Sequence, residues 1–183
     1  MGMETCIEGR ELLLQRLTHQ AIEHNYTDAL AALIRYGADP NATTPEGLTL
    51  LMIAALYDRP HAIHILLTTP QADPNGRDQA GTTALMLAAE RGHPHCVQQL
   101  LSAPAINIGA QDIACDTALD RAHARFKQTG NNGNQRCIAL IEEYHARQKQ
   151  CVFSSTIAAC KELLWPSTPT HYCGSRMPKV KVD

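Results

Sequence analysis

The sequence predicts an all-α solenoid of helix-turn-helix repeats with hairpin-like loops, followed by a helix that covers the last repeat. A nine-residue pattern begins at Gly47, Gly81 and Cys115, so its copies are 34 residues apart. The turn sequence Ala-Asp-Pro-Asn occurs at residues 38–41 and 34 residues later at 72–75. Recurrence at such a period indicates stacked repeats. Aromatic residues are only 4% of the chain, and a core of Leu, Ile and Ala favours helices over sheets.

Each period predicts one loop and two short helices. Gly47 and Gly81 follow turn-forming residues and can adopt a positive φ without steric cost. Thr49, Thr83 and Thr117 stand where a helix needs an N-cap. Paired alanines follow two of these threonines and allow neighbouring helices to approach closely. A proline then begins the second helix, whose apolar residues recur at helical spacing.

These residues resemble the ankyrin repeat family. The best copies are residues 83–93, which read Thr-Ala-Leu-Met-Leu-Ala-Ala-Glu-Arg-Gly-His, and residues 36–41, which read Tyr-Gly-Ala-Asp-Pro-Asn. The resemblance covers about residues 12–144. It implies an ankyrin repeat domain over residues 1–144, a curved stack of four antiparallel helix pairs at about 12–43, 44–77, 78–111 and 112–144.

The chain departs from the family pattern at its helix starts and in its first and last repeats. Met52, Met86 and Asp120 replace the family's helix-start His, so the hydrogen bonds of that His are expected to be missing. The first repeat has Arg16 at the threonine position and is expected to form a polar cap, because its outer face meets water. The last repeat contains an insertion at residues 128–135. Its Gly and Asn residues predict a flexible turn before the second helix resumes at about residue 136.

The chain beyond residue 144 predicts two further segments. Residues 145–165 form a C-terminal helical cap, because an amphipathic segment begins at about Gln150 and ends at Trp165-Pro166. The alternative is that this segment binds a partner separately. Residues 166–183 contain three prolines and few apolar residues, which predicts a flexible tail.

Composition narrows the function classes. The formal net charge is −2, which gives no general reason to bind nucleic acid or anionic lipid. No run of 18 apolar residues predicts a membrane span, and the first ten residues do not read as a signal peptide. The seven cysteines are scattered along the chain, which indicates free thiols in a protein from a reducing compartment. We therefore expect a cytoplasmic protein that is monomeric alone, and translocation into a host cell is compatible with this.

Catalytic and metal chemistry have little support in the sequence. His61 and His64 lie three residues apart, and His93, His95 and Cys96 cluster at a predicted helix start. Such spacing suits a metal ion, but His93 occupies an ordinary family position and no second ligand cluster accompanies it. No phosphate loop, dinucleotide fingerprint or nucleophile motif occurs. We expect no enzyme activity, no catalytic or metal-binding residues and no cofactor.

The resemblance implies a non-catalytic protein–protein interaction module that serves as an adaptor, an inhibitor or a translocated effector. In the family, loop tips and the exposed side of the first helices form a concave binding surface. The matching positions in this chain are Glu46, Leu48, Met52, Leu56, Tyr57, Thr82, Met86, Glu90, Arg91, Ile113, Asp116 and Arg125. For Met52, Met86 and Leu56, packing between first helices is an equal alternative.

Tyr57 and Arg91 are expected to lie at the centre of this surface. They are one period apart and are residue types that often dominate interface energy. Glu90 beside them is expected to select the partner's register. An alternative function is an enzyme or a metal-dependent regulator that uses the C-terminal extension. Its candidate ligands are Cys151, Cys160, His171 and Cys173.

Overall fold

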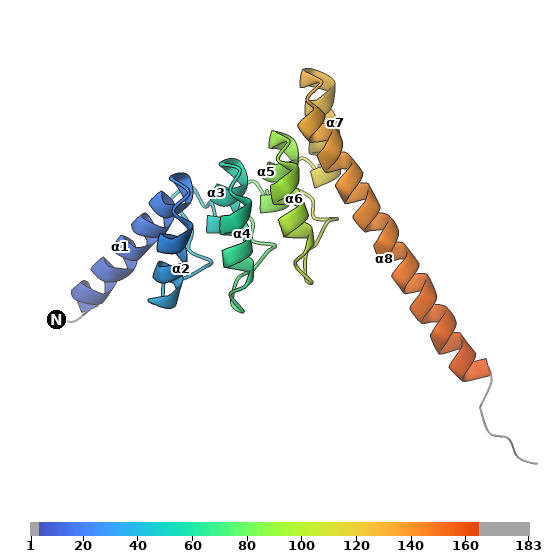
Figure 1. The fold of residues 1–183 in the computed structure, drawn as a ribbon, viewed down its shortest axis with the longest axis horizontal. Coiled ribbons are helices and arrows are strands. Elements are labelled where there is room, and N and C mark those ends of the chain that lie inside the picture. Colours follow the sequence, from blue (N-terminus) through green and yellow to red (C-terminus); the bar gives the residue numbers. More distant parts are fainter. Residues whose placement is uncertain (1–3, 165–183) are drawn as a thin grey trace, which may run out of the picture. The chain divides into compact units, whose positions relative to one another are not determined.

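The computed structural model describes the backbone of residues 4–164 and the side chains of residues 10–149. The helices of this part are α1 (Glu4–Glu23), α2 (Thr27–Arg35), α3 (Leu50–Leu56), α4 (Pro60–Leu67), α5 (Ala84–Arg91), α6 (Pro94–Leu101), α7 (Ala118–Thr129) and α8 (Asn132–Leu164) (Figure 1). Its β pairing consists of two isolated bridges, Thr43–Thr49 and Arg77–Thr83. The all-α prediction is confirmed. The chain divides into two compact units, residues 1–146 and 147–183, and the repeats lie in the first.

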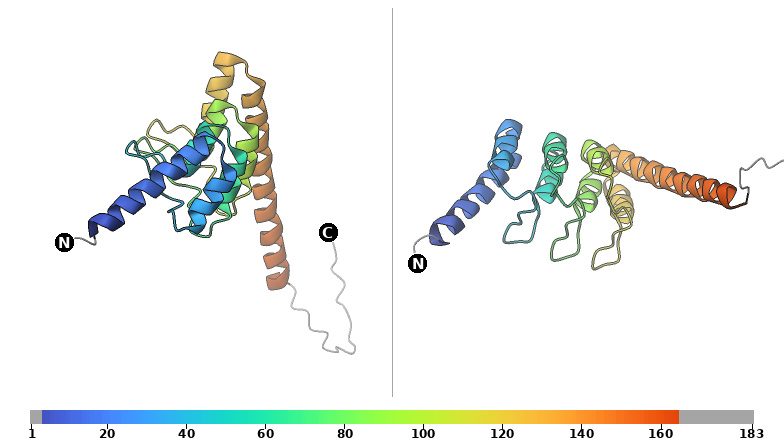
Figure 2. Two further views of the ribbon diagram at one scale, coloured as in Figure 1. Left: turned by 60° about the vertical axis from the view of Figure 1, so that its left-hand side comes forward. Right: turned by 90° about the horizontal axis from the view of Figure 1, so that it is seen from below.

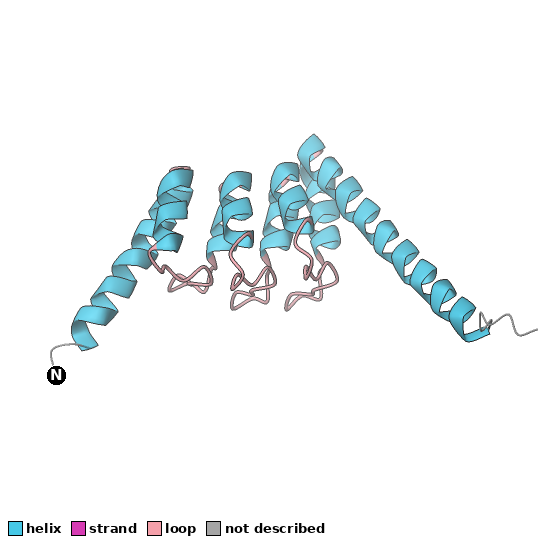
Figure 3. Cartoon of the chain, turned by 60° about the horizontal axis from the view of Figure 1, so that its bottom comes forward, coloured by secondary structure: helices cyan, strands magenta, loops and turns pink. Residues whose placement is uncertain are grey.

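Two layers of helices build the repeats. The first helices α1, α3, α5 and α7 stack side by side, and the second helices α2, α4 and α6 stack as the other layer (Figure 2). The loops between repeats gather on one side of the stack (Figure 3). Each inner first helix therefore has a first helix on both sides, whereas α1 has one on a single side.

Threonine caps begin three of the first helices. The hydroxyl oxygens of Thr49, Thr83 and Thr117 accept hydrogen bonds from the backbone N–H three residues later, at 3.3, 3.4 and 3.3 Å. This confirms the predicted N-caps. One expectation is corrected. Asp120 restores the helix-start hydrogen bonds, because its carboxylate accepts from the backbone N–H of Thr117 at 3.0 Å and from its hydroxyl at 2.7 Å.

Left-handed residues end the first helices. Asn25, Asp58 and Gly92 have φ of +59°, +53° and +73° and occupy equivalent places after α1, α3 and α5. Asn and Asp are the side chains that tolerate this conformation best. Cys115 also has a positive φ, +64°, where the two preceding loops carry glycine. Both turns, the one after a first helix and the one before the next, therefore keep their left-handed conformation although the residue at the turn changes.

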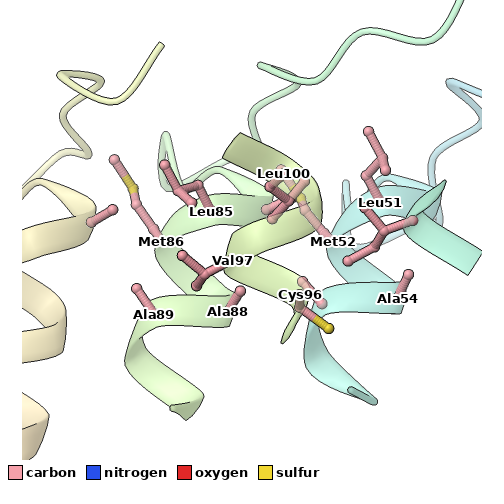
Figure 4. Close-up of a cluster of buried hydrophobic side chains, with 14 of the residues drawn as sticks. Leu51, Met52, Ala54, Leu85, Met86, Ala88, Ala89, Cys96, Val97 and Leu100 are labelled. Atoms are coloured by element: carbon pink, nitrogen blue, oxygen red, sulfur yellow. The ribbon is translucent and has the colours of Figure 1, made fainter. Parts of the chain in front are cut away.

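Small and aliphatic side chains fill the space between the layers. Leu51, Leu85, Val97 and Leu100 are buried, and alanine pairs on α3 and α5 are buried with them (Figure 4). Because alanine occupies little volume, adjacent first helices pack closely at these positions. The core is continuous from α1 to α8 rather than divided by repeat.

Asparagine side chains connect consecutive loops. The amide of Asn41 donates to the carbonyl of Gln71 at 2.6 Å and accepts from the backbone N–H of Asp73 at 2.8 Å. Asn75 makes the same two bonds to the next loop, at 2.8 and 2.7 Å. The repeated Asp-Pro-Asn turn is thus an inter-repeat link as well as a local turn.

A second set of links joins each second helix to the preceding repeat. The guanidinium of Arg59 donates to the carbonyl of Glu23, at the end of α1, at 2.8 Å. The imidazole of His93, one repeat later, lies 3.7 Å from the carboxylate of Asp58. The amide of Asn134 donates to two carbonyls at the end of α5, both at 2.8 Å. Arg59 and Asn134 donate to backbone carbonyls at the ends of first helices, where carbonyls lack a partner within the helix. His93 instead contacts the side chain of the residue that follows α3.

Most of the insertion in the fourth repeat is helical, so the turn predicted over residues 128–135 is shortened to residues 130 and 131. It lengthens α7 to Thr129, and Gly130 ends that helix with φ +63°. The helix α8 then begins at Asn132 rather than at about residue 136. Asn134 is buried, because the bonds to α5 described above hold it against the third repeat.

The helix predicted near the C-terminus is continuous with the fourth repeat. The backbone of α8 runs without interruption from Asn132 to Leu164, across the predicted boundary between residues 144 and 145. The side chains of residues 150–165 lie outside the described residues, and the role of this segment as a cap stays a prediction. The expected flexible tail, residues 166–183, also lies outside them.

The first repeat is not the polar cap expected from the sequence. Leu12, Leu13 and Leu17 on α1 are exposed, as are Tyr26 and Tyr36 at the two ends of α2. The helix α1 also begins at residue 4, well before the expected start of the repeat at about residue 12.

We expect Leu85→Ala and Leu51→Ala each to lower the free energy of unfolding by roughly 2–5 kcal/mol, because each leaves a cavity in a close-packed core. Both leucines are almost fully buried. Ile113→Ala removes a side chain that is 81% exposed and should change stability by less than about 0.5 kcal/mol. Urea unfolding of the three variants measures this. A small effect at both leucines would contradict the helix register.

We expect Gly133→Ala to destabilise the protein by about 1–3 kcal/mol, because the new methyl group would collide with the carbonyl oxygen of Gly92. Alanine otherwise stabilises a helix interior relative to glycine, so the close packing reverses the usual sign. Gly109→Ala, which meets only the side chain of Asn107 at 3.7 Å, is the control. A higher melting temperature for Gly133→Ala would show that α5 and α8 do not approach this closely.

Candidate protein-binding surface

The structure separates the twelve predicted surface residues into three groups. Six are exposed, namely Glu46, Tyr57, Arg91, Ile113, Asp116 and Arg125. Three are half-buried, namely Leu48, Leu56 and Glu90. Three are buried, namely Met52, Thr82 and Met86.

Met52 and Met86 belong to the core, which decides between the two alternatives left open by the sequence. Both side chains lie within the apolar cluster between first helices (Figure 4). The sulfur of Met52 also accepts a long hydrogen bond, 3.5 Å, from the backbone N–H of Thr49. Thr82 is buried at the loop base, where its N–H donates to the carboxylate of Asp78 at 2.8 Å. These three residues are therefore withdrawn from the candidate surface.

Tyr57, Arg91 and Arg125 form a row across three repeats. Tyr57 follows α3, Arg91 is the last residue of α5, and Arg125 lies on α7. The three residues are successively 34 positions apart. Packed helices lie about 10 Å apart, so stacking of these helices presents one exposed side chain at each such step.

The ring of Tyr57 is held in place by the first repeat. Its hydroxyl donates to the carboxylate of Glu23 at 2.7 Å, and this bond and the nearby negative charge raise the pKa of Tyr57. The side chain is 46% exposed. The ring therefore offers an accessible face in an orientation that is fixed before any partner binds.

Glu90 is already paired within the protein. Its carboxylate accepts from the guanidinium of Arg121 at 3.0 Å. The same guanidinium donates twice to the carboxylate of Asp112, at 2.6 and 2.9 Å. Hydrogen bonds from the backbone N–H groups of Asp116 and Ala114 and from Arg121 hold the pKa of Asp112 below its usual value. This network joins repeats three and four, so Glu90 is not the free charge expected to select a partner's register.

The comparison with protein families agrees with this architecture. A family model for ankyrin repeats, in three copies, matches residues 18–112. The chain belongs to the ankyrin repeat family. The match runs from the last part of α1 to the loop after α6, and the described structure adds a fourth pair from α7 and the start of α8. Ankyrin repeats generally mediate protein–protein interaction, and ankyrin repeat proteins are typically non-catalytic.

In the described part of the chain, two arginines of the row Tyr57, Arg91 and Arg125 have no charged partner, whereas the nearby carboxylates are held by other side chains. Glu23 is bonded by Tyr57, and Asp58 faces both His93 and the Cys96 thiol. Within the part of the chain that the structure describes, Arg91 and Arg125 form no ion pair. The nearest polar partner of Arg125 is Gln128, at a long 3.4 Å. The sequence shows the arginines, but only the fold shows that the neighbouring carboxylates are engaged.

The other three exposed residues of the predicted surface lie at the tips of the loops between repeats. Glu46, Ile113 and Asp116 lie in the loops that precede α3 and α7. The hydroxyl of Thr44 lowers the pKa of Glu46 by hydrogen bonding. The side chain of Ile113 is 81% exposed while its N–H donates to the carbonyl of Ala80 at 3.0 Å. Its apolar side chain is therefore available on a loop that the backbone holds in place.

The buried thiol of Cys96 contacts a polar pair that the sequence did not reveal, Asp58 and His93. Its thiol donates to the carboxylate of Asp58 at 3.3 Å, and His93 lies 3.7 Å from the same carboxylate. Burial and this carboxylate raise the pKa of Cys96, and burial raises that of Cys137 to about 12. Both thiols therefore stay protonated at neutral pH, which suits packing rather than nucleophilic chemistry.

The other chemical candidates do not converge on a site. His61, His64 and His95 line an open groove of about 580 Å³ on the second helices. Over the described residues, no three His, Cys, Asp or Glu side chains are placed to share a metal ion. The alternative ligands, Cys151, Cys160, His171 and Cys173, lie outside the residues whose side chains are described. None of the described helices is long and apolar enough to cross a membrane.

We expect acid to destabilise the protein partly through Asp112. Because the pKa of Asp112 is lowered in the folded state, its stabilisation is complete above the unfolded value of about 4 and is lost as pH falls through the folded value. The melting temperature of Asp112→Asn should therefore be lower than wild type at pH 7 and should fall less below pH 4. Asp116→Asn, an exposed change in the same loop, is the control. Equal acid slopes for wild type and Asp112→Asn would contradict this.

Proposed function

We propose that this protein is a non-catalytic protein-binding module that holds its partner on the row Tyr57, Arg91 and Arg125 together with the adjacent loop tips. The observation that carries the proposal is the row itself, which presents three large exposed side chains at the spacing of the repeats. An adaptor, an inhibitor and a translocated effector all use such a surface. The buried, protonated thiols of Cys96 and Cys137 are compatible with the expected cytoplasmic location.

The chemistry of the row supports binding to a folded protein surface. Tyr and Arg are enriched among residues that dominate interface energy. The bond from Tyr57 to Glu23 orients the ring in advance, which reduces the entropy lost on binding. The cations at Arg91 and Arg125 favour a partner that presents carboxylates about 10 Å apart, the distance between packed helices.

We expect the double variant Tyr57→Ala/Arg91→Ala to weaken binding at least about tenfold, which corresponds to 1.4 kcal/mol. The partner is first identified by crosslinking and mass spectrometry, and its Kd for the purified full chain is then measured by calorimetry. The melting temperature should change little, because both side chains are exposed.

The matched control is Arg35→Ala/Tyr36→Ala. These residues have the same types and are also exposed, but they lie at the end of α2. The control should retain wild-type affinity. Equal affinity for wild type and the Tyr57/Arg91 variant, or equal loss in both double variants, would place the interface elsewhere.

A further inference from the structure

The exposed face of the second helices α4 and α6 has histidines as its only exposed ionisable residues. Neither helix contains Asp, Glu, Lys or Arg. The side chains of His61, His64 and His95 are exposed on this face. Within the part of the chain that the structure describes, these three imidazoles form no ion pair or hydrogen bond with another protein group. The charge at the centre of this face therefore depends on histidine alone.

The histidines line a groove that continues onto the next second helix. The groove over α4 and α6 has a volume of about 580 Å³ and also contains Gln98 and Gln99. A second groove of about 230 Å³ shares His95 and Gln98 with the first, and Arg136 and Glu143 of α8 line its other side. We call the two grooves together the histidine furrow. Because packed helices lie about 10 Å apart, the furrow extends roughly 20 Å across three second helices.

We propose that the histidine furrow binds an acidic segment of a partner protein, and that it binds this segment more tightly as the pH falls. Histidine gains its positive charge between about pH 8 and pH 5. Protonated imidazoles donate strong hydrogen bonds to carboxylates. His61 and His95 are each the second residue of their helix, so stacking places them about 10 Å apart. An extended segment presents a carboxylate at that interval every three residues.

The uncharged lining favours a polypeptide over a nucleic acid. The amides of Gln98 and Gln99 both donate and accept hydrogen bonds, so they can pair with the backbone of an extended segment as well as with its carboxylates. Proteins that bind nucleic acid neutralise phosphates with several Lys and Arg side chains, whereas Arg136 is the only such residue that lines the furrow. An acidic protein segment is therefore the occupant that this lining matches.

The charges on the elements packed against α4 and α6 nearly balance while the imidazoles are neutral. The carboxylates on these elements and on the turns that join them belong to Asp28, Asp58, Glu90, Glu142 and Glu143. The guanidinium groups belong to Arg35, Arg59, Arg91 and Arg136. Two further imidazoles, those of His93 and His145, gain charge in the same direction as the three in the furrow. An acidic segment is therefore attracted weakly at neutral pH and more strongly once the histidines are protonated.

Fluorescence anisotropy with a labelled deca-aspartate peptide tests the proposal on the full chain. Aspartate carboxyls stay ionised at about pH 5.5, so a change in binding between about pH 7.5 and 5.5 at constant ionic strength reports on the protein. We expect the Kd to fall at least about tenfold at the lower pH. His61→Gln/His64→Gln/His95→Gln should remove this pH dependence and leave the melting temperature unchanged, because all three side chains are exposed.

The matched control is His19→Gln/His24→Gln/His123→Gln, which changes three histidines outside the furrow and should keep the pH dependence. Equal affinity at both pH values would overturn the proposal, and so would a pH dependence that the furrow variant retains. A labelled single-stranded oligonucleotide that binds at about pH 5.5 while the peptide does not would identify a phosphate backbone as the ligand, and would also overturn it.

The histidine furrow is separate from the row Tyr57, Arg91 and Arg125, so this inference does not rest on the proposed function. The gain in affinity at low pH should persist in Tyr57→Ala/Arg91→Ala. Loss of that gain in the row variant would place the peptide on the row and overturn the furrow as its site. Failure of the furrow would leave the row to be tested by its own variants.

Discussion

The short helices of the inner repeats cannot bury their own apolar residues, and the rest of the structure depends on this constraint. With 7 or 8 residues, α3 and α5 become stable only when a neighbour covers each side. The alanine pairs allow that neighbour to approach, and the threonine caps fix where each helix begins. The stack is thus stabilised mainly between repeats.

Polar side chains reinforce the same inter-repeat contacts. Asn41 and Asn75 connect successive loops on one side of the stack. Arg59 and Asn134 reach from a second helix to the carbonyls at the end of the preceding repeat's first helix. Each link satisfies backbone groups that a helix or loop end leaves unpaired. Register between repeats is therefore set by hydrogen bonds as well as by packing.

The proposed binding surface follows from how this scaffold distributes its charges. Arg121 engages Glu90 and Asp112 to connect repeats three and four, and Tyr57 engages Glu23 across repeats one and two. These contacts hold the carboxylates of Glu23, Glu90 and Asp112 within the protein. The side chains of Arg91 and Arg125 remain for a partner, so the scaffold's own stability determines the chemistry that the surface offers.

The sequence by itself determined the period, the threonine caps at Thr49, Thr83 and Thr117, the buried leucines and the family, because each depends on residues close together in the chain. It predicted the expected surface positions only in part. The burial of Met52 and Met86, the pairing of Glu90 with Arg121, and the ordered insertion around Asn134 were decided by the tertiary structure. Each depends on a neighbour 31 to 45 residues away or on the packing of adjacent repeats, and such neighbours are specified only when the repeats stack.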